Sequence, residues 1–241
     1  RVCLHYLLAL LFALLAMQRT LDYLTDPRKS VLWQIHLLVL AALFTFEWSL
    51  VIPVLLATLV LVWFFAQKMP LSPALFGKLF APQAGLWALY FLLNKIKIGD
   101  WVGHYGADTH LNMDPKYMSA NMLRYTVKQF AFARDWEHNF KAPFFESLAD
   151  GRPFWLGTGI VLLVAAVWLL FFRRLNLRLR WAGAAFAWFF VALLPVSNLF
   201  FYALQYSEND RYGYFANGFG WIGLLLLLSF LPKMFFRAII V

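Results

Sequence analysis

Residues 209–214 combine an acid and a base with two tyrosines, directly before an apolar run. Asp210 and Arg211 are adjacent, and Tyr212 and Tyr214 follow them. Arginine suits a phosphate or pyrophosphate because its planar fork donates two hydrogen bonds at once. We therefore expect Arg211 to bind phosphate, with Asp210 holding its orientation. The alternative interpretation is a band of aromatic residues at a membrane surface, with an arginine that reaches toward water.

Two further polar positions interrupt apolar stretches of the chain. Glu47 stands between two apolar runs. A carboxylate at membrane depth costs about 3 kcal/mol or more, so it should face protein, water or a cation rather than lipid. The alternative is a tight turn at the level of the lipid headgroups. Further on, Pro195 can break a helix, and Ser197 and Asn198 can bond the carbonyls that it frees.

A glycine-rich segment, residues 103–106, carries the candidate histidines. His104 and Tyr105 lie within it, and His110 follows. Histidine can act as a general acid, a metal ligand or a hydrogen-bond donor. Two histidines six residues apart do not form a recognised metal motif, and packing of the loop is the plainer interpretation. Cys3 is the single cysteine, so we expect neither a cysteine-based metal site nor a disulfide within the chain.

Composition decides which solvent surrounds these residues. Of the 241 residues, 63% are hydrophobic and 14% are charged, whereas soluble domains carry about 25% charged residues. A soluble globular protein is therefore excluded, and we predict an all-α, polytopic transmembrane helix bundle. Apolar runs that cross, or nearly cross, a bilayer indicate about seven spans: residues 2–17, 31–46, 49–66, 80–94, 154–172, 182–204 and 215–231.

Basic residues divide the connections between these spans into two groups. Eleven basic and two acidic residues, which account for the whole net charge of +9, lie on four alternate connections: 18–30, 67–79, 173–181 and 232–237. Because short cytoplasmic loops retain lysine and arginine, we place this face in the cytoplasm. Glu47, residues 95–153 and residues 205–214 then lie on the outer face. The positive charge needs no nucleic acid as a partner.

The connection of about 60 residues at 95–153 is long enough to form an outer loop with structure of its own. Asp114 and Pro115 predict the start of a helix near 116–133. We expect an interfacial helix lying on the membrane, with an apolar stripe of Tyr117, Met118, Met122, Tyr125 and Phe130, and with Lys116, Arg124 and Lys128 elsewhere on its surface. The chain then has three parts: 1–94 with four spans, 95–153, and 154–241 with three spans.

In their order along the chain, these motifs resemble those of the GT-C superfamily of polytopic glycosyltransferases. The likeness is to bacterial relatives of the O-mannosyltransferases that carry tetratricopeptide repeats, and it covers most of residues 35–230. That group has an outer-turn glutamate with a proline six residues later, like Glu47 and Pro53. Its Gly-Tyr-Gly loop before His-Leu is similar to 103–111. Its Pro-x-Ser-Asn and Glu-Arg-Tyr-Leu-Tyr-Leu-Pro-Ser are similar to 195–198 and 210–217, with departures at Phe46, Asp210, Ala216 and Asn217.

The resemblance implies transfer of a sugar from a polyprenyl-phosphate donor to a protein or glycan acceptor, at the periplasmic face of a bacterial inner membrane. Four residues would bind the donor phosphate: Arg211, Asp210, Tyr212 and Tyr214. Other candidates on the outer face are Glu47, His104, Tyr105, His110, Ser197 and Asn198. Enzymes of this group keep the catalytic acid in their first outer loop, upstream of Arg1, so no catalytic residue is named. Participation of a divalent cation is left open.

Two other classes of function compete with this one. A non-catalytic scaffold or accessory subunit would use the outer loop for contacts with partner subunits and would tolerate loss of Glu47 or Arg211. A transporter would need polar residues in mid-helix and inverted repeats, but charges within the predicted spans are almost absent. Because Arg1 opens directly onto an apolar run and residues 237–241 begin another, we expect the chain to be a piece of a longer protein.

Overall fold

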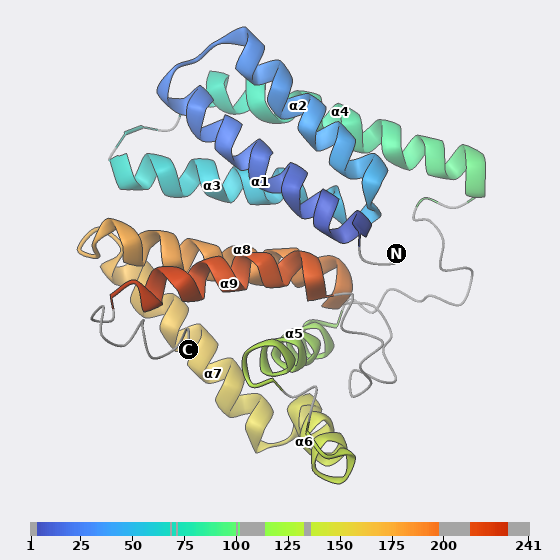
Figure 1. Cartoon of the computed structure of the whole chain (residues 1–241), viewed down its shortest axis with the longest axis vertical. Coiled ribbons are helices and arrows are strands. Elements are labelled where there is room, and N and C mark those ends of the chain that lie inside the picture. Colours follow the sequence, from blue (N-terminus) through green and yellow to red (C-terminus); the bar gives the residue numbers. More distant parts are fainter. Residues whose placement is uncertain are drawn as a thin grey trace.

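The computed structural model describes residues 4–67, 69–70, 72–99, 101, 114–132, 136–197 and 213–230. Every regular element in these ranges is a helix, so the prediction of an all-α protein is confirmed (Figure 1). The elements are α1 (Leu4–Thr25), α2 (Lys29–Thr45), the short 3₁₀ helix η1 (Glu47–Val51), α3 (Ile52–Gln67), α4 (Pro73–Ile98), α5 (Pro115–Phe130), α6 (His138–Asp150), α7 (Arg152–Phe171), α8 (Leu177–Ser197) and α9 (Tyr214–Leu228).

Four helical segments are long and apolar enough to cross a membrane: α1, Ser49–Gln67, α7 and α8. Helices α2 and α9 are apolar but shorter, with 17 and 15 residues. Helix α4 is longer than any of these, with 26 residues, but it contains Lys78 and Gln83 and is not among the four. Each of the seven predicted apolar runs therefore falls largely on a helix, and four of these helices meet the criteria for a span.

Capping residues fix the start of α5 and both ends of α4. The Asp114 side chain accepts a 3.0 Å hydrogen bond from the backbone N–H of Lys116, and Pro115 occupies the first turn of α5, as predicted. Ser72 caps α4 in the same way, through the backbone N–H of Leu75. Gly99 ends α4 with φ 86°, a left-handed conformation that glycine adopts without steric cost.

Connections between antiparallel neighbours bring three of the four basic segments to one end of the bundle, on the left in Figure 1. We call this the basic end and define it by the connections 26–28 and 172–176, the C-terminus of α3 and the N-terminus of α4. Arg180 joins two of them: its guanidinium donates to the carbonyl of Arg173 at 2.8 Å and to that of Ala66, at the end of α3, at 3.5 Å. The fourth basic segment, 232–237, lies outside the described residues.

Small residues allow the central helices to approach closely. Ala9, Ala13 and Ala16 on α1 are fully buried. A methyl group added at Gly218 of α9 would lie 2.5 Å from Leu10 of α1, inside van der Waals contact. On the same helix Gly220 faces Phe130 of α5, and Gly223 faces Phe186 of α8. Helix α9 can therefore lie against three other helices, as small residues permit within a membrane.

Helix α7 lies apart from the other apolar helices (Figure 1). Only 6% of its most apolar 18-residue window is buried. Two glycine contacts attach it: a methyl group at Gly183 of α8 would clash with the ring of Trp168, and one at Gly157 would lie 3.2 Å from Leu123 of α5. Phe154 is also buried, beside Ala120 and Leu123 of α5, and most of the remaining apolar surface of α7 is exposed, as expected for side chains in contact with lipid.

The structure of residues 95–153 differs from the prediction in three ways. Helix α4 continues to Ile98, so the predicted boundary at residue 95 falls inside a helix. Helix α6 was not predicted, although Phe140, Phe144, Phe145 and Leu148 have helical spacing. Finally, α5 packs against α6, α7 and α8, which the prediction did not include; its position relative to the membrane stays a prediction. Lys128 on α5 is only 7% exposed.

The two groups of connections should lie on opposite sides of the membrane. In a Cys3→Ser background, a single cysteine at exposed Asn139 of α6 should react with an impermeant maleimide added to the outside of intact cells. A cysteine at exposed Arg178, at the basic end, should react only after permeabilisation. The Cys3→Ser protein is the unlabelled control. Reaction of both positions from the same side would contradict this topology.

Candidate functional site

The turn that carries Glu47 joins α2 to α3 at the end of the bundle opposite the basic end (Figure 1). Phe46 is extended, with φ −157° and ψ 122°, and its carbonyl accepts a 2.9 Å hydrogen bond from the backbone N–H of Ser49. The chain turns here within five residues, and η1 packs against α8. The backbone of Glu47 therefore lies in a tight turn between two apolar helices; its side chain lies outside the described residues.

An aromatic cluster of His5, Tyr6, Phe46 and Tyr214 connects this turn to α1 and α9. The ring centroids of Tyr6 and Phe46 are 4.4 Å apart, and those of Tyr6 and Tyr214 are 6.1 Å apart, both edge to face. His5 lies 5.4 Å from Phe46. Tyr6 and Phe46 are buried, and Tyr214 is partly open to the surroundings. The cluster thus holds the residue before Glu47 beside the start of α9, three residues after Arg211.

A chain of buried polar groups crosses from α6 through α5 to α8. Arg124 donates from Nε to the carbonyl of Phe145 at 2.8 Å, and from Nη1 to Oδ1 of Asn121 at 3.1 Å. Asn121 in turn donates from Nδ2 to the carbonyl of Ser197 at 2.8 Å. Asn121 and Ser197 are both 0% exposed. These bonds fix α5 against the last turn of α8, immediately before residue 198.

Ser197 also bonds within its own helix. Its hydroxyl donates to the carbonyl of Leu194 at 2.9 Å, in the last turn of α8. This is not the carbonyl that Pro195 leaves without an N–H, which belongs to Val191, four residues before the proline. Pro195 does not break the helix, which continues to Ser197. A break at Pro195 is therefore not found within the described residues, which end at Ser197 in this part of the chain.

Burial changes the electrostatics of Arg124. Removal from water lowers the pKa of its guanidinium, whereas Tyr117 and the Glu146 carboxylate act in the opposite direction. Arginine remains charged even so. A fixed positive charge therefore lies in α5, close to the end of α8, where an anion could be attracted.

The predicted site residues are described only in part. The structure describes Ser197, Tyr214 and the backbone of Glu47, and it brings all three to the end of the bundle opposite the basic end. The other candidates lie outside the described residues: His104, Tyr105, His110, Asn198, Asp210, Arg211 and Tyr212. Whether those side chains meet the aromatic cluster stays a prediction.

Sequence reasoning missed the central polar residue of this region, Asn121. It lies four residues after Tyr117 and four before Tyr125, within the stripe predicted to be apolar. A polar side chain in the middle of an apolar helix face was the signal, because such a group must find a partner when buried. Sequence reasoning also missed Ser49. This residue is fully buried in η1, and its hydroxyl has no hydrogen-bond partner in the part of the chain that the structure describes.

Neither a metal site nor similarity to a known protein assigns a function to this region. Among the described side chains, no three histidine, cysteine, aspartate or glutamate residues gather as a metal site would require. No protein-family model matches the chain, and no curated protein or solved structure is significantly similar to it.

Removal of the Asn121 amide should destabilise the protein. Asn121→Ala leaves the Ser197 carbonyl and part of the Arg124 guanidinium without their partner, and an unsatisfied buried group costs about 1–3 kcal/mol. The free energy of unfolding in detergent measures this change. Asn139→Ala, at an exposed position of α6, is the control and should change stability by less than about 0.5 kcal/mol. Equal stability of the two variants would contradict the bond network.

Proposed function

We propose that this protein acts as a membrane glycosyltransferase of the GT-C type, which transfers a sugar from a polyprenyl-phosphate donor. In this proposal all seven apolar segments span the membrane, with α2, α4 and α9 sheltered by neighbouring helices. The basic end faces the cytoplasm, and the reaction takes place at the opposite face, which would be periplasmic in a bacterial inner membrane.

The observation that supports this proposal most directly is the aromatic cluster. It joins Phe46, Tyr6 and Tyr214, so the turn with Glu47 lies beside the start of α9 although the two are far apart in sequence. The buried bonds of Asn121 hold the end of α8 in the same part of the bundle. Three of the motifs that resemble the GT-C enzymes therefore have their described portions at one end of the molecule.

The chemistry would be an inverting displacement at the anomeric carbon of the donor. An acceptor hydroxyl attacks that carbon, the bond from carbon to phosphate oxygen breaks, and the polyprenyl phosphate leaves with the electron pair. A carboxylate base, which the resemblance places upstream of Arg1, would accept the hydroxyl proton. Arg211 would stabilise the negative charge on the leaving phosphate with two hydrogen bonds. Tyr212 and Tyr214 would line the path of the isoprenoid chain.

Replacement of Arg211 tests this function. Arg211→Lys keeps the charge but loses the planar fork, so sugar transfer should fall at least tenfold, and Arg211→Ala should abolish it. Transfer from a polyprenyl-phosphate sugar by the full-length protein is measured per amount of folded protein in detergent.

Arg178→Lys and Arg178→Ala, at the basic end, are the matched controls and should leave transfer unchanged. Full activity of Arg211→Ala would remove Arg211 from the site. Absence of any transfer by the wild-type protein, across polyprenyl-phosphate sugars, would favour the scaffold or accessory subunit instead.

A further inference from the structure

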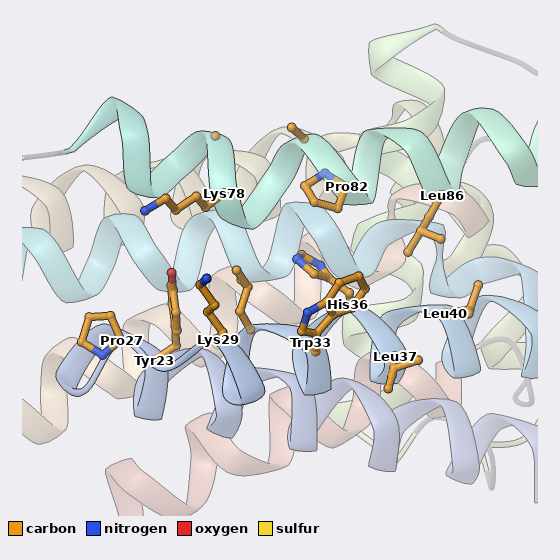
Figure 2. Close-up of a pocket in the computed structure, with 13 residues that line it drawn as sticks. Tyr23, Pro27, Lys29, Trp33, His36, Leu37, Leu40, Lys78, Pro82 and Leu86 are labelled. Atoms are coloured by element: carbon orange, nitrogen blue, oxygen red, sulfur yellow. The ribbon is translucent and has the colours of Figure 1, made fainter.

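A groove of about 800 Å³ lies between α2 and α4, and the end of α1 closes one end of it (Figure 2). This volume falls within the range of about 300–1,000 Å³ that is typical of sites for small ligands. The groove lies toward the basic end and is separate from the aromatic cluster. Tyr23 of α1 and side chains of α2 and α4 line it.

Polarity changes along the length of this groove. Figure 2 shows Lys29 and Lys78 near one end, on α2 and α4, while Leu37, Leu40 and Leu86 line the other end. Both lysines are exposed, and within the described ranges neither forms an ion pair. The acid nearest in sequence to Lys29, Asp26, pairs with Arg28. The groove therefore offers two uncompensated positive charges at its mouth and an apolar wall beyond them.

His36 adds a buried polar group between these two ends. It lies seven residues after Lys29, two helical turns or about 10 Å along α2, and is 8% exposed. Its ring interacts with the backbone of Lys78, although neither ring nitrogen reaches a regular hydrogen bond. Pro82 explains why the carbonyl of Lys78 is available to His36. Proline lacks the N–H that would otherwise bond this carbonyl, four positions earlier in the helix.

Gly77 lines the groove on the α4 side and carries no side chain. A methyl group added at Gly77 would have no neighbouring atom within 4 Å, so the wall there faces empty space. Trp33, on the opposite wall, is 68% exposed and offers a broad apolar ring to whatever occupies the groove. An indole at the mouth of such a groove suits the boundary between headgroups and acyl chains.

We propose that this groove binds one anionic phospholipid of the leaflet at the basic end. Its phosphate lies between Lys29 and Lys78, its glycerol-ester region lies at the depth of His36, and one acyl chain runs along Leu37, Leu40 and Leu86. Positive charge at the mouth and apolar walls below match a lipid with a negative headgroup, and basic pockets between membrane helices recognise lipids in this way. A free phosphate ion would use the lysines but leave the apolar walls uncovered.

Binding of a fluorescent short-chain phosphatidylglycerol to the purified chain, in a zwitterionic detergent, tests the proposal. Phosphatidylcholine with the same chains should bind at least tenfold more weakly, because it carries no net charge. Lys29→Gln with Lys78→Gln should weaken phosphatidylglycerol binding about tenfold. The matched control, Arg173→Gln with Arg178→Gln, removes two charges from the same end outside the groove and should have less than a twofold effect.

A second variant tests the apolar part without a change of charge. Gly77→Leu fills the open wall, so it should weaken phosphatidylglycerol binding at least fivefold, whereas Gly77→Ala should have a smaller effect. Size-exclusion profiles and thermal melting confirm that each variant is folded. Three results would overturn the proposal: equal binding of the two lipids, equal losses in the groove and control double variants, or full displacement of the lipid by millimolar inorganic phosphate.

Discussion

Close packing of small residues against large ones holds the centre of this bundle together. Where lipid surrounds a protein, apolar side chains gain little by leaving it, so helices associate through tight contact rather than through exclusion of water. The buried alanines of α1 and the glycines at 218, 220 and 223 of α9 supply that contact. They bring α1, α5, α8 and α9 together, and the aromatic cluster and the Asn121 bonds depend on this arrangement.

Antiparallel packing separates the two ends of the molecule chemically. Each short connection reverses the chain, so basic connections collect at one end while the turn at Glu47 and the starts of α1 and α9 collect at the other. The basic end also contains the mouth of the groove between α2 and α4. The proposed catalytic region and the proposed lipid groove therefore lie at opposite ends of the bundle and are formed largely by different helices, so a change in one site need not disturb the other.

The sequence predicted the helices better than their contacts. Apolar runs locate spans because the thickness of a bilayer sets their length, and Asp114 with Pro115 marks a helix start through local bonds. By contrast, α6 is short, and polar residues interrupt its apolar pattern, so it was not predicted. The role of Asn121 depends on a carbonyl 76 residues away. Long-range pairings of this kind depend on which face each helix turns toward its neighbours. The hydropathy of a single sequence does not predict that orientation. The groove at Lys29 and Lys78 was missed for the same reason, since its walls come from two helices.

Helix α7 makes fewer buried contacts than the central helices do. Leu163 and Leu170 are largely exposed, so we expect leucine, isoleucine, valine or phenylalanine to be tolerated there, whereas a charged side chain would be costly in lipid. Phe154, Gly157 and Trp168, which contact α5 or α8, are constrained in shape as well. The 20 residues of α7 match the thickness of a typical bilayer, so its length is set by lipid, whereas the central helices are also constrained by their contacts with one another.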